Sequence, residues 1–269
     1  MRRPLLATLT AVAAAIALLA GCGSSAGSDA GAPAGSASAS GTPPTFAGKI
    51  TVFAAASLTG SFTTLGKQFE AAHTDATITF SFGPSSGLAT QITEGAPADV
   101  FASASAKNMD AVVAAQAAEA PSTFAENVME IAVAPGNPAR IATLADLAQA
   151  DVKVALCQPD VPCGTVAAKV LAAAGLTVTP VTLEADVKAT LTKIELGEVD
   201  AGLVYVTDVL AAGDRVMGIE IPADVNAATS YPIATLAAST SPELAKAFVD
   251  YVLSADGARV LAAAGFQTP

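Results

Sequence analysis

The chain has few of the residues that metal sites and nucleic-acid surfaces need. Its 269 residues include one His, three Cys and no Trp, and only 14% of them are charged. These are too few His and Cys for a Cys/His metal site or a His-rich hydrolytic centre. Thirteen Lys and Arg are outnumbered by 24 Asp and Glu, which gives a formal charge of −11. This balance argues against nucleic-acid binding, because phosphate recognition depends on clustered Lys and Arg.

One continuously apolar segment stands at the start of the chain. It runs from Pro4 to Ala20 behind two Arg residues and ends in Leu19-Ala20-Gly21-Cys22. This pattern predicts an export signal over residues 1–21, and Cys22 as the lipid-bearing residue of a bacterial lipoprotein. An ordinary signal peptide followed by a chance Cys is the alternative.

A segment of small residues comes next. Residues 23–47 are nearly all Gly, Ala, Ser, Thr or Pro, with Asp29 as the one charge and Phe46 as the one large apolar group. Such a composition buries too little surface to offset the entropy of ordering, so we expect a flexible linker over residues 22–47. As a coil it would reach roughly 25 to 30 Å and tether a folded domain to a membrane.

From Lys49 onward, short apolar runs alternate with helical patterns of about ten to fifteen residues, which is typical of βαβ units. We predict strands at residues 50–54, 77–82, 99–102, 129–134, 152–156, 178–183 and 201–205. We predict helices near residues 57–72, 88–93, 107–117, 165–174, 187–196 and 242–264. The predicted fold class is therefore α/β, with mainly parallel sheets flanked by helices.

Two extended runs indicate crossings between two lobes. Residues 128–135 close on Pro-Gly-Asn-Pro, and residues 230–237 form the second run. We therefore predict a first lobe of residues 48–130 and 231–269, and a second lobe of residues 131–230. One continuous doubly wound sheet is the alternative, which composition alone does not exclude.

Four strand-to-helix junctions place small or polar residues where a helix begins. They are Ser57, Ser85-Ser86, Pro162-Cys163 and Asp186-Val187. In open α/β sheets such junctions meet at the carboxyl ends of the strands, where free helix-terminal N–H groups favour an anion. Each junction alone is more often a simple cap, as we expect for the Ser57 hydroxyl. The hypothesis of one anion site therefore rests on their combination.

The end of the strand at 201–205 adds an aromatic candidate. Tyr205 is either a packed core residue or a phenol donor to a ligand.

The segment Gly83-Pro84-Ser85-Ser86-Gly87 also matches the G-x-S-x-G nucleophile elbow, so a serine hydrolase that uses Ser85 is the alternative function. That chemistry needs a His after the nucleophile in chain order, and the single His of the chain, His73, precedes Ser85. We expect His73 to be a solvated residue at a helix end, and we expect no enzyme activity.

Cys157 and Cys163 flank a Pro-containing loop in a chain that we expect to be exported. This compartment and spacing favour a disulfide, with two buried thiols as the alternative. A lipidated Cys22 accounts for the odd count of cysteines.

Several motifs resemble the molybdate-binding proteins that deliver an oxyanion to ABC importers. Residues 50–59, ITVFAAASLT, are similar to the family's opening strand and first ligand serine. Residues 82–88, FGPSSGL, are similar to its second serine loop. The similarity covers the chain from about Lys49 and continues through residues 95–101, 161–164, 185–188 and 202–205.

The resemblance implies a two-lobed periplasmic-binding-protein fold of type II, with molybdate or tungstate in the cleft between the lobes and no cofactor. It implies five ligand residues, which donate from hydroxyl or backbone N–H groups: Ser57, Ser85, Cys163, Val187 and Tyr205. Cys163 departs from the small residue expected there, often Ala, but a backbone contact survives that change. The implied partners of a monomer outside the cytoplasm are an ABC permease and, through Cys22, the membrane.

No Lys or Arg is among these ligands, so neutral dipoles would hold the dianion. Hydrogen phosphate would be rejected, because its proton would meet donors that offer it no acceptor. Sulfate is smaller and would not reach every donor of a rigid cavity.

Overall fold

The structure is a computed structural model that describes residues 45–269. The predicted export signal, Cys22 and the predicted linker up to residue 44 lie outside the described residues. Strand β1 (Ala47–Ala55) begins at the last residue of the predicted linker. Phe46, just before it, packs edge-on against His73, with ring centroids 5.2 Å apart. No helix among residues 45–269 has the length and apolar character to cross a membrane.

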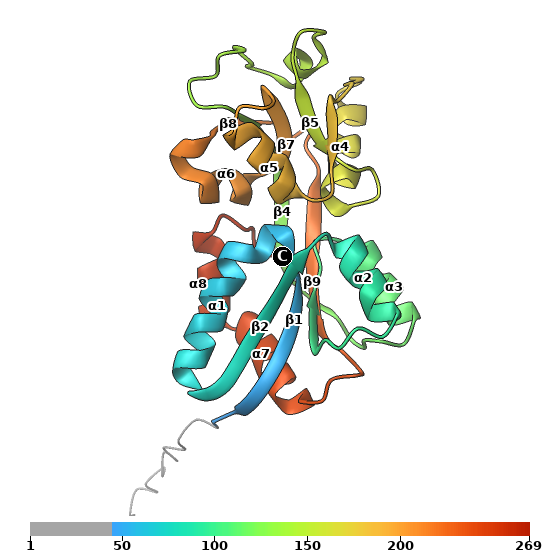
Figure 1. Ribbon diagram of the computed structural model, residues 1–269, viewed down its shortest axis with the longest axis vertical. Helices are drawn as coiled ribbons and strands as arrows, with labels where there is room; N and C mark the ends of the chain where they lie inside the picture. The colour runs from blue at the N-terminus through green and yellow to red at the C-terminus, as the bar shows by residue number, and fades with distance from the viewer. Residues whose placement is uncertain (1–44) are drawn as a thin grey trace, which may run out of the picture. The chain divides into compact units, whose positions relative to one another are not determined.

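The first lobe is built around β1. In the same lobe, β2 (Asp75–Gly83) and β3 (Val100–Ala102) pair with β1 in parallel. Its helices are α1 (Thr59–Ala72), α2 (Ser85–Thr93), α3 (Ala106–Ala114), α7 (Pro242–Val252) and α8 (Ala255–Ala263). Figure 1 shows α1 on one side of the strands and α2 and α3 on the other. Side chains alternate between the two faces of a strand, so Val52 packs in the core with α1 and α7 while Phe53 packs with α2 and α3.

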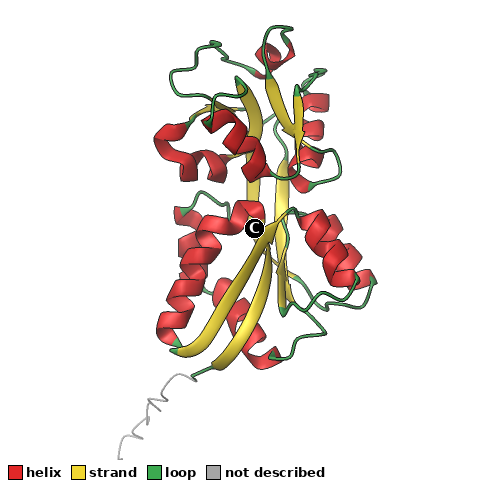
Figure 2. Cartoon of the chain, viewed as in Figure 1, coloured by secondary structure: helices red, strands yellow, loops and turns green. Residues whose placement is uncertain are grey.

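The second lobe repeats this layered arrangement. Here β5 (Val154–Cys157) pairs in parallel with β6 (Thr182–Glu184) and β7 (Ala201–Tyr205). Its helices are α4 (Pro162–Ala173), α5 (Val187–Glu195) and α6 (Val206–Ala212). Strand β8 (Met217–Glu220) pairs with β4. Figure 2 shows helices beside the strands in both lobes. Short 3-10 turns lie at Ala56–Leu58 (η1), Leu144–Ala148 (η2) and Gly213–Arg215 (η3).

Two strands connect the lobes. The first half of β4 (Ser122–Val133) pairs antiparallel with β9 (Ala228–Thr235), and its second half pairs antiparallel with β7. One hydrophobic core gathers buried residues between Met129 and Ile221, and the others gather residues before and after that stretch. The predicted crossings at 128–135 and 230–237 thus overlap β4 and β9. The boundaries at 130/131 and 230/231 fall within these strands and stay a prediction.

Several features differ from the sequence-based expectation. The strands have the order β2-β1-β3-β9-β4-β7-β5-β6. Parallel and antiparallel pairs are mixed in it, because β4 and β9 pair antiparallel with their neighbours. The helix predicted over 242–264 is two helices. The first ends at Val252, and Ser254 caps the second, because its Oγ accepts from Gly257 N–H at 3.2 Å. Helix α6 was not predicted, since it follows β7 without an intervening turn.

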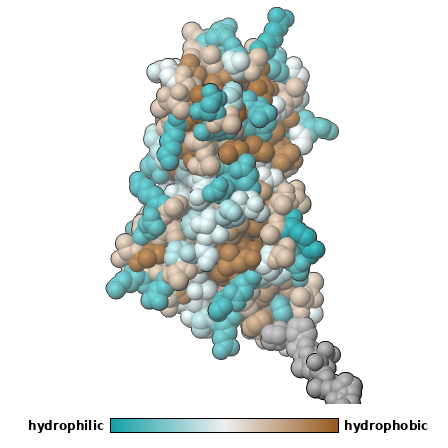
Figure 3. Space-filling model, turned by 180° about the vertical axis from the view of Figure 1, so that it is seen from behind, coloured by the Kyte–Doolittle hydropathy of each residue, from teal (hydrophilic) through white to brown (hydrophobic). Residues whose placement is uncertain are grey.

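Most large apolar side chains of the described residues lie inside the lobes. The exposed ones are Val181, Leu183, Leu196, Leu210, Met217 and Leu253. Figure 3 shows hydrophilic side chains over both lobes of one face, with separate hydrophobic areas between them. The apolar residues therefore serve chiefly to form the cores of the lobes.

Candidate anion-binding site

A small cavity lies between the two lobes, where helices of both begin. Its wall includes the five residues implied by the resemblance, which are Ser57 and Ser85 from the first lobe and Cys163, Val187 and Tyr205 from the second. All five are buried, and Ser57 is the most exposed of them at 7%. The cavity volume is about 20 Å³, little more than the roughly 10 to 15 Å³ that one water needs. The space therefore suits one compact ion.

Three helices begin at the wall of this cavity. Helix α2 starts after Pro84 and α4 starts after Val161, and neither has a side-chain cap. Helix α5 starts at Val187, and Asp186 caps it by accepting from Ala189 N–H at 2.9 Å. Free N–H groups in a first helical turn, together with the positive end of the helix dipole, favour an anion. The three junctions thus meet at one place from both lobes.

The hydroxyls of Ser57 and Ser85 contact groups outside the helices at whose starts they lie. Ser57 Oγ lies 2.9 Å from Tyr231 Oη, so the expectation that it caps α1 is wrong. Ser85 Oγ accepts from Ala104 N–H at 3.0 Å. Because Ser85 accepts from the protein, its own proton is free to donate into the cavity.

Tyr205 is the most informative residue of the cavity wall. It is 1% exposed, and its Oη has no hydrogen-bond partner among the described residues. Burial, helped by Tyr231 and Asp208, raises the pKa of Tyr205 well above its ordinary value, so the phenol keeps its proton. A buried donor without an acceptor is costly. Its position at the cavity indicates a ligand that accepts hydrogen bonds.

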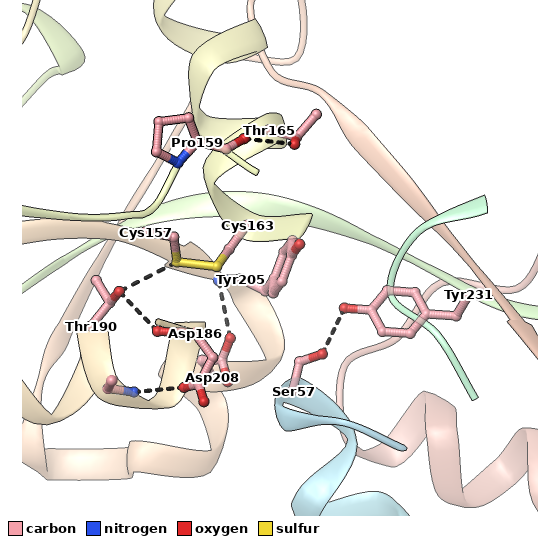
Figure 4. Close-up of a disulfide and its surroundings, with 11 residues drawn as sticks. Ser57, Cys157, Pro159, Cys163, Thr165, Asp186, Thr190, Tyr205, Asp208 and Tyr231 are labelled. Carbon is pink, nitrogen blue, oxygen red and sulfur yellow. Dashed lines mark hydrogen bonds between the residues drawn. A yellow bond between two sulfur atoms is a disulfide. The ribbon is translucent and has the colours of Figure 1, made fainter. Parts of the chain in front are cut away.

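A disulfide stabilises the second-lobe side of the cavity. It joins Cys157, at the end of β5, to Cys163 in the first turn of α4 (Figure 4). Cys157 Sγ also lies 3.3 Å from Thr190 Oγ1, which donates to the backbone oxygen of Asp186 at 3.1 Å. A Cβ at Gly164 would lie 1.9 Å from the backbone oxygen of Gln158, so only glycine fits there. These contacts connect the start of α4 to the start of α5.

An ion pair beside the cavity was not found by the sequence analysis. Lys188 Nζ lies 2.8 Å from Asp208 Oδ1, and Asp208 also accepts from Tyr205 N–H at 3.2 Å. Burial raises the pKa of Asp208, although Lys188 acts in the opposite direction. Since the two charges offset each other, Lys188 brings little net positive charge to the cavity. The signals available in the sequence were Lys188, one residue after the implied ligand residue Val187, and Asp208, three residues after Tyr205.

The site lacks the parts of a serine hydrolase. His73 and Ser85 lie at opposite ends of β2, which is roughly 26 Å long at 3.3 Å per residue. His73 is half-buried rather than solvated, with its ring centroid 4.4 Å from that of Phe69. Residues 45–269 also contain no group of three His, Cys, Asp or Glu placed to hold a metal ion. The hydrolase alternative is therefore not supported.

Comparison with known proteins identifies the family. The model of the bacterial extracellular solute-binding protein family matches residues 50–267. The molybdate-binding protein ModA of Mycobacterium tuberculosis is 43% identical over 234 residues, which is 87% of this chain and 90% of that protein. The chain belongs to the ModA family of extracellular solute-binding proteins.

Other comparisons agree with this assignment. ModA of Escherichia coli is 32% identical to this ModA-family protein over 230 residues, covering 81% of the chain and 89% of the relative. The periplasmic molybdate-binding protein of Azotobacter vinelandii has the same fold, with a TM-score of 0.72 at 22% identity over 82% of this chain and 99% of its own. The predicted family and the two-lobed fold are thus confirmed. Members of this family bind substrates and are not enzymes.

Proposed function

We propose that this ModA-family protein binds molybdate or tungstate outside the cytoplasmic membrane and delivers the oxyanion to an ABC importer. The observation that carries the proposal is the buried Tyr205 phenol, which has no partner among the described residues at a cavity lined by helix starts. Three relatives or structural neighbours named above are molybdate-binding proteins. The small cavity volume favours an inorganic ion over a larger substrate.

We assign the ligand contacts as follows. Ser57 and Ser85 donate from their hydroxyl and backbone N–H groups, and Cys163 and Val187 donate from backbone N–H groups. Tyr205 donates from its phenol. Because each lobe supplies only part of the set, the anion bridges the lobes and favours their closed arrangement.

The donor set also explains the choice of anion. Every assigned group donates, so the site suits a dianion that carries no proton. A dianion larger than sulfate reaches donors on both walls at once. Molybdate and tungstate have nearly the same size and charge, and we expect both to bind.

We further propose that Cys22 carries a lipid and that the segment before β1 is a tether. A tether of this kind would keep the monomeric binding protein close to its permease and raise its local concentration there. The sequence Leu19-Ala20-Gly21-Cys22 supports this assignment.

Calorimetric titration of the purified protein with molybdate, tungstate, sulfate and phosphate tests the ligand. We expect strong heat signals for the first two anions, and weak or no signals for sulfate and phosphate. An ester-hydrolysis assay on the same sample tests the alternative. Hydrolysis that Ser85→Ala abolishes, without any oxyanion binding, would overturn the proposal.

A further inference from the structure

A second buried tyrosine lies behind the first ligand serine. Tyr231, in β9, is fully buried. Its Oη lies 2.9 Å from Ser57 Oγ and 3.5 Å from Asn127 Nδ2, the second being a long contact. Figure 4 shows the Tyr231 phenol pointing at the Ser57 hydroxyl. The ligand role assigned to Ser57 does not by itself require this contact.

The orientation of the Asn127 amide is set by its other contacts. Asn127 lies in β4, which connects the lobes, and is 1% exposed. Its Oδ1 accepts from Val128 N–H at 3.0 Å, and its Nδ2 donates to Thr207 Oγ1 of α6 at 2.8 Å. The amide nitrogen therefore faces Tyr231. Since an amide nitrogen donates and does not accept, Asn127 cannot take the phenol proton.

These contacts decide the direction of the hydrogen bond to Ser57. Among the described residues, the contacts of Tyr231 Oη are Ser57 and Asn127, so Ser57 Oγ is the acceptor for its proton. Burial raises the pKa of Tyr231 above its ordinary value, against the opposing effect of its bonds to Ser57 and Asn127, so that proton is retained. Ser57 accepts from Tyr231 and directs its own proton into the cavity.

We propose that Tyr231, oriented by Asn127, is a positioning residue that fixes Ser57 as a donor and so excludes oxyanions that carry a proton. This inference rests on the proposed function. A ligand proton would need the second lone pair of Ser57 Oγ, and this arrangement would turn the Ser57 proton away from the anion. Among the described residues that proton would then have no acceptor, because Tyr231 donates to Ser57 Oγ and does not accept from it. Ser85 is restricted in the same way by Ala104 N–H. Both hydroxyls of the site are thus held as donors by the protein.

Tyr231→Phe tests the proposal, because it removes the phenol and keeps the ring. The probes are selenate and hydrogen arsenate, two dianions of similar size of which only the second carries a proton. Each is titrated directly and as a competitor of molybdate. Tyr251→Phe is the matched control, since the Tyr251 phenol donates to Gln68 at an exposed position.

We expect the wild type and Tyr251→Phe to prefer selenate strongly. In Tyr231→Phe, molybdate should bind about tenfold more weakly, and the preference for selenate should shrink by roughly fivefold or more. The preference is the decisive measurement, because a merely structural role for Tyr231 would weaken both anions alike. Thermal unfolding without ligand checks that each variant is folded.

A double-mutant cycle with Ser57→Ala gives a second test. If Tyr231 acts through Ser57, Tyr231→Phe should cost no further molybdate affinity in the Ser57→Ala background. An unchanged preference in Tyr231→Phe, or an added loss in the double variant, would overturn the inference. If the wild type binds no molybdate, the proposed function is wrong. Direct titration of selenate and hydrogen arsenate into the wild type and Tyr231→Phe would still test the role of Tyr231.

Discussion

Replacing Tyr205 by Phe should weaken molybdate binding without lowering the thermal stability of the protein. The change removes one hydroxyl whose oxygen has no hydrogen-bond partner among the described residues. In the complex, that hydroxyl would donate to a charged oxygen, a contact that contributes about 1.5 to 3 kcal/mol. Because Tyr205 is 1% exposed, solvent screening does not reduce this value. Since each 1.4 kcal/mol is a factor of ten, affinity should fall roughly tenfold to more than a hundredfold.

Calorimetry measures the loss, and thermal unfolding separates it from damage to the fold. Without ligand, Tyr205→Phe should unfold at the wild-type temperature or slightly above, because a buried donor without an acceptor has been removed. With molybdate, its gain in melting temperature should be smaller than that of the wild type. Tyr251→Phe, which loses an exposed phenol, should match the wild type in both. If Tyr205→Phe binds molybdate as tightly as the wild type, Tyr205 is a core aromatic and not a ligand.

Three further predictions concern the proposed lipid anchor and the start of α4. Metabolic labelling with a fatty acid should label the wild type and not Cys22→Ala. Equal labelling of both would show that Cys22 is not the lipidated residue. Replacing Cys157 and Cys163 together by Ser should lower the free energy of unfolding by about 2 kcal/mol. It should also weaken oxyanion binding in calorimetry, and an unchanged affinity would show that the disulfide does not position α4. Gly164→Ala, whose Cβ would meet backbone oxygen at 1.9 Å, should lower the melting temperature sharply, while Gly60→Ala, with no atom within 4 Å of its Cβ, should not.

The sequence predicted the elements that depend on local pattern. The strand at 201–205 has the predicted bounds, and the starts of α2, α4 and α5 lie at the predicted junctions or within three residues of their predicted starts. The five implied ligand residues line one cavity. Both results follow from the parallel βα unit, which places its junctions at one edge of the sheet.

The residues that hold the ligand groups were missed, because their roles depend on partners far apart in the chain. Ser57 and Tyr231 are 174 residues apart, and Asn127 lies 80 residues from Thr207. A serine before a helix has the same local pattern whether its hydroxyl caps the helix or accepts from a distant phenol. Only the packing of β4 and β9 between the lobes decides which contact forms.

The proposed site would have to bind a dianion within an acidic protein. The formal charge of −11 gives a dianion no long-range attraction, and the ammonium group of Lys188, which follows Val187 in the chain, is paired with Asp208. Affinity must therefore come from short-range contacts to oriented dipoles, which are strongest where water is excluded. Such contacts require both lobes, since the donors are divided between them. In the proposed function, binding and closure would be the same event, and a transporter that recognises the closed form would distinguish loaded from empty protein without contacting the anion.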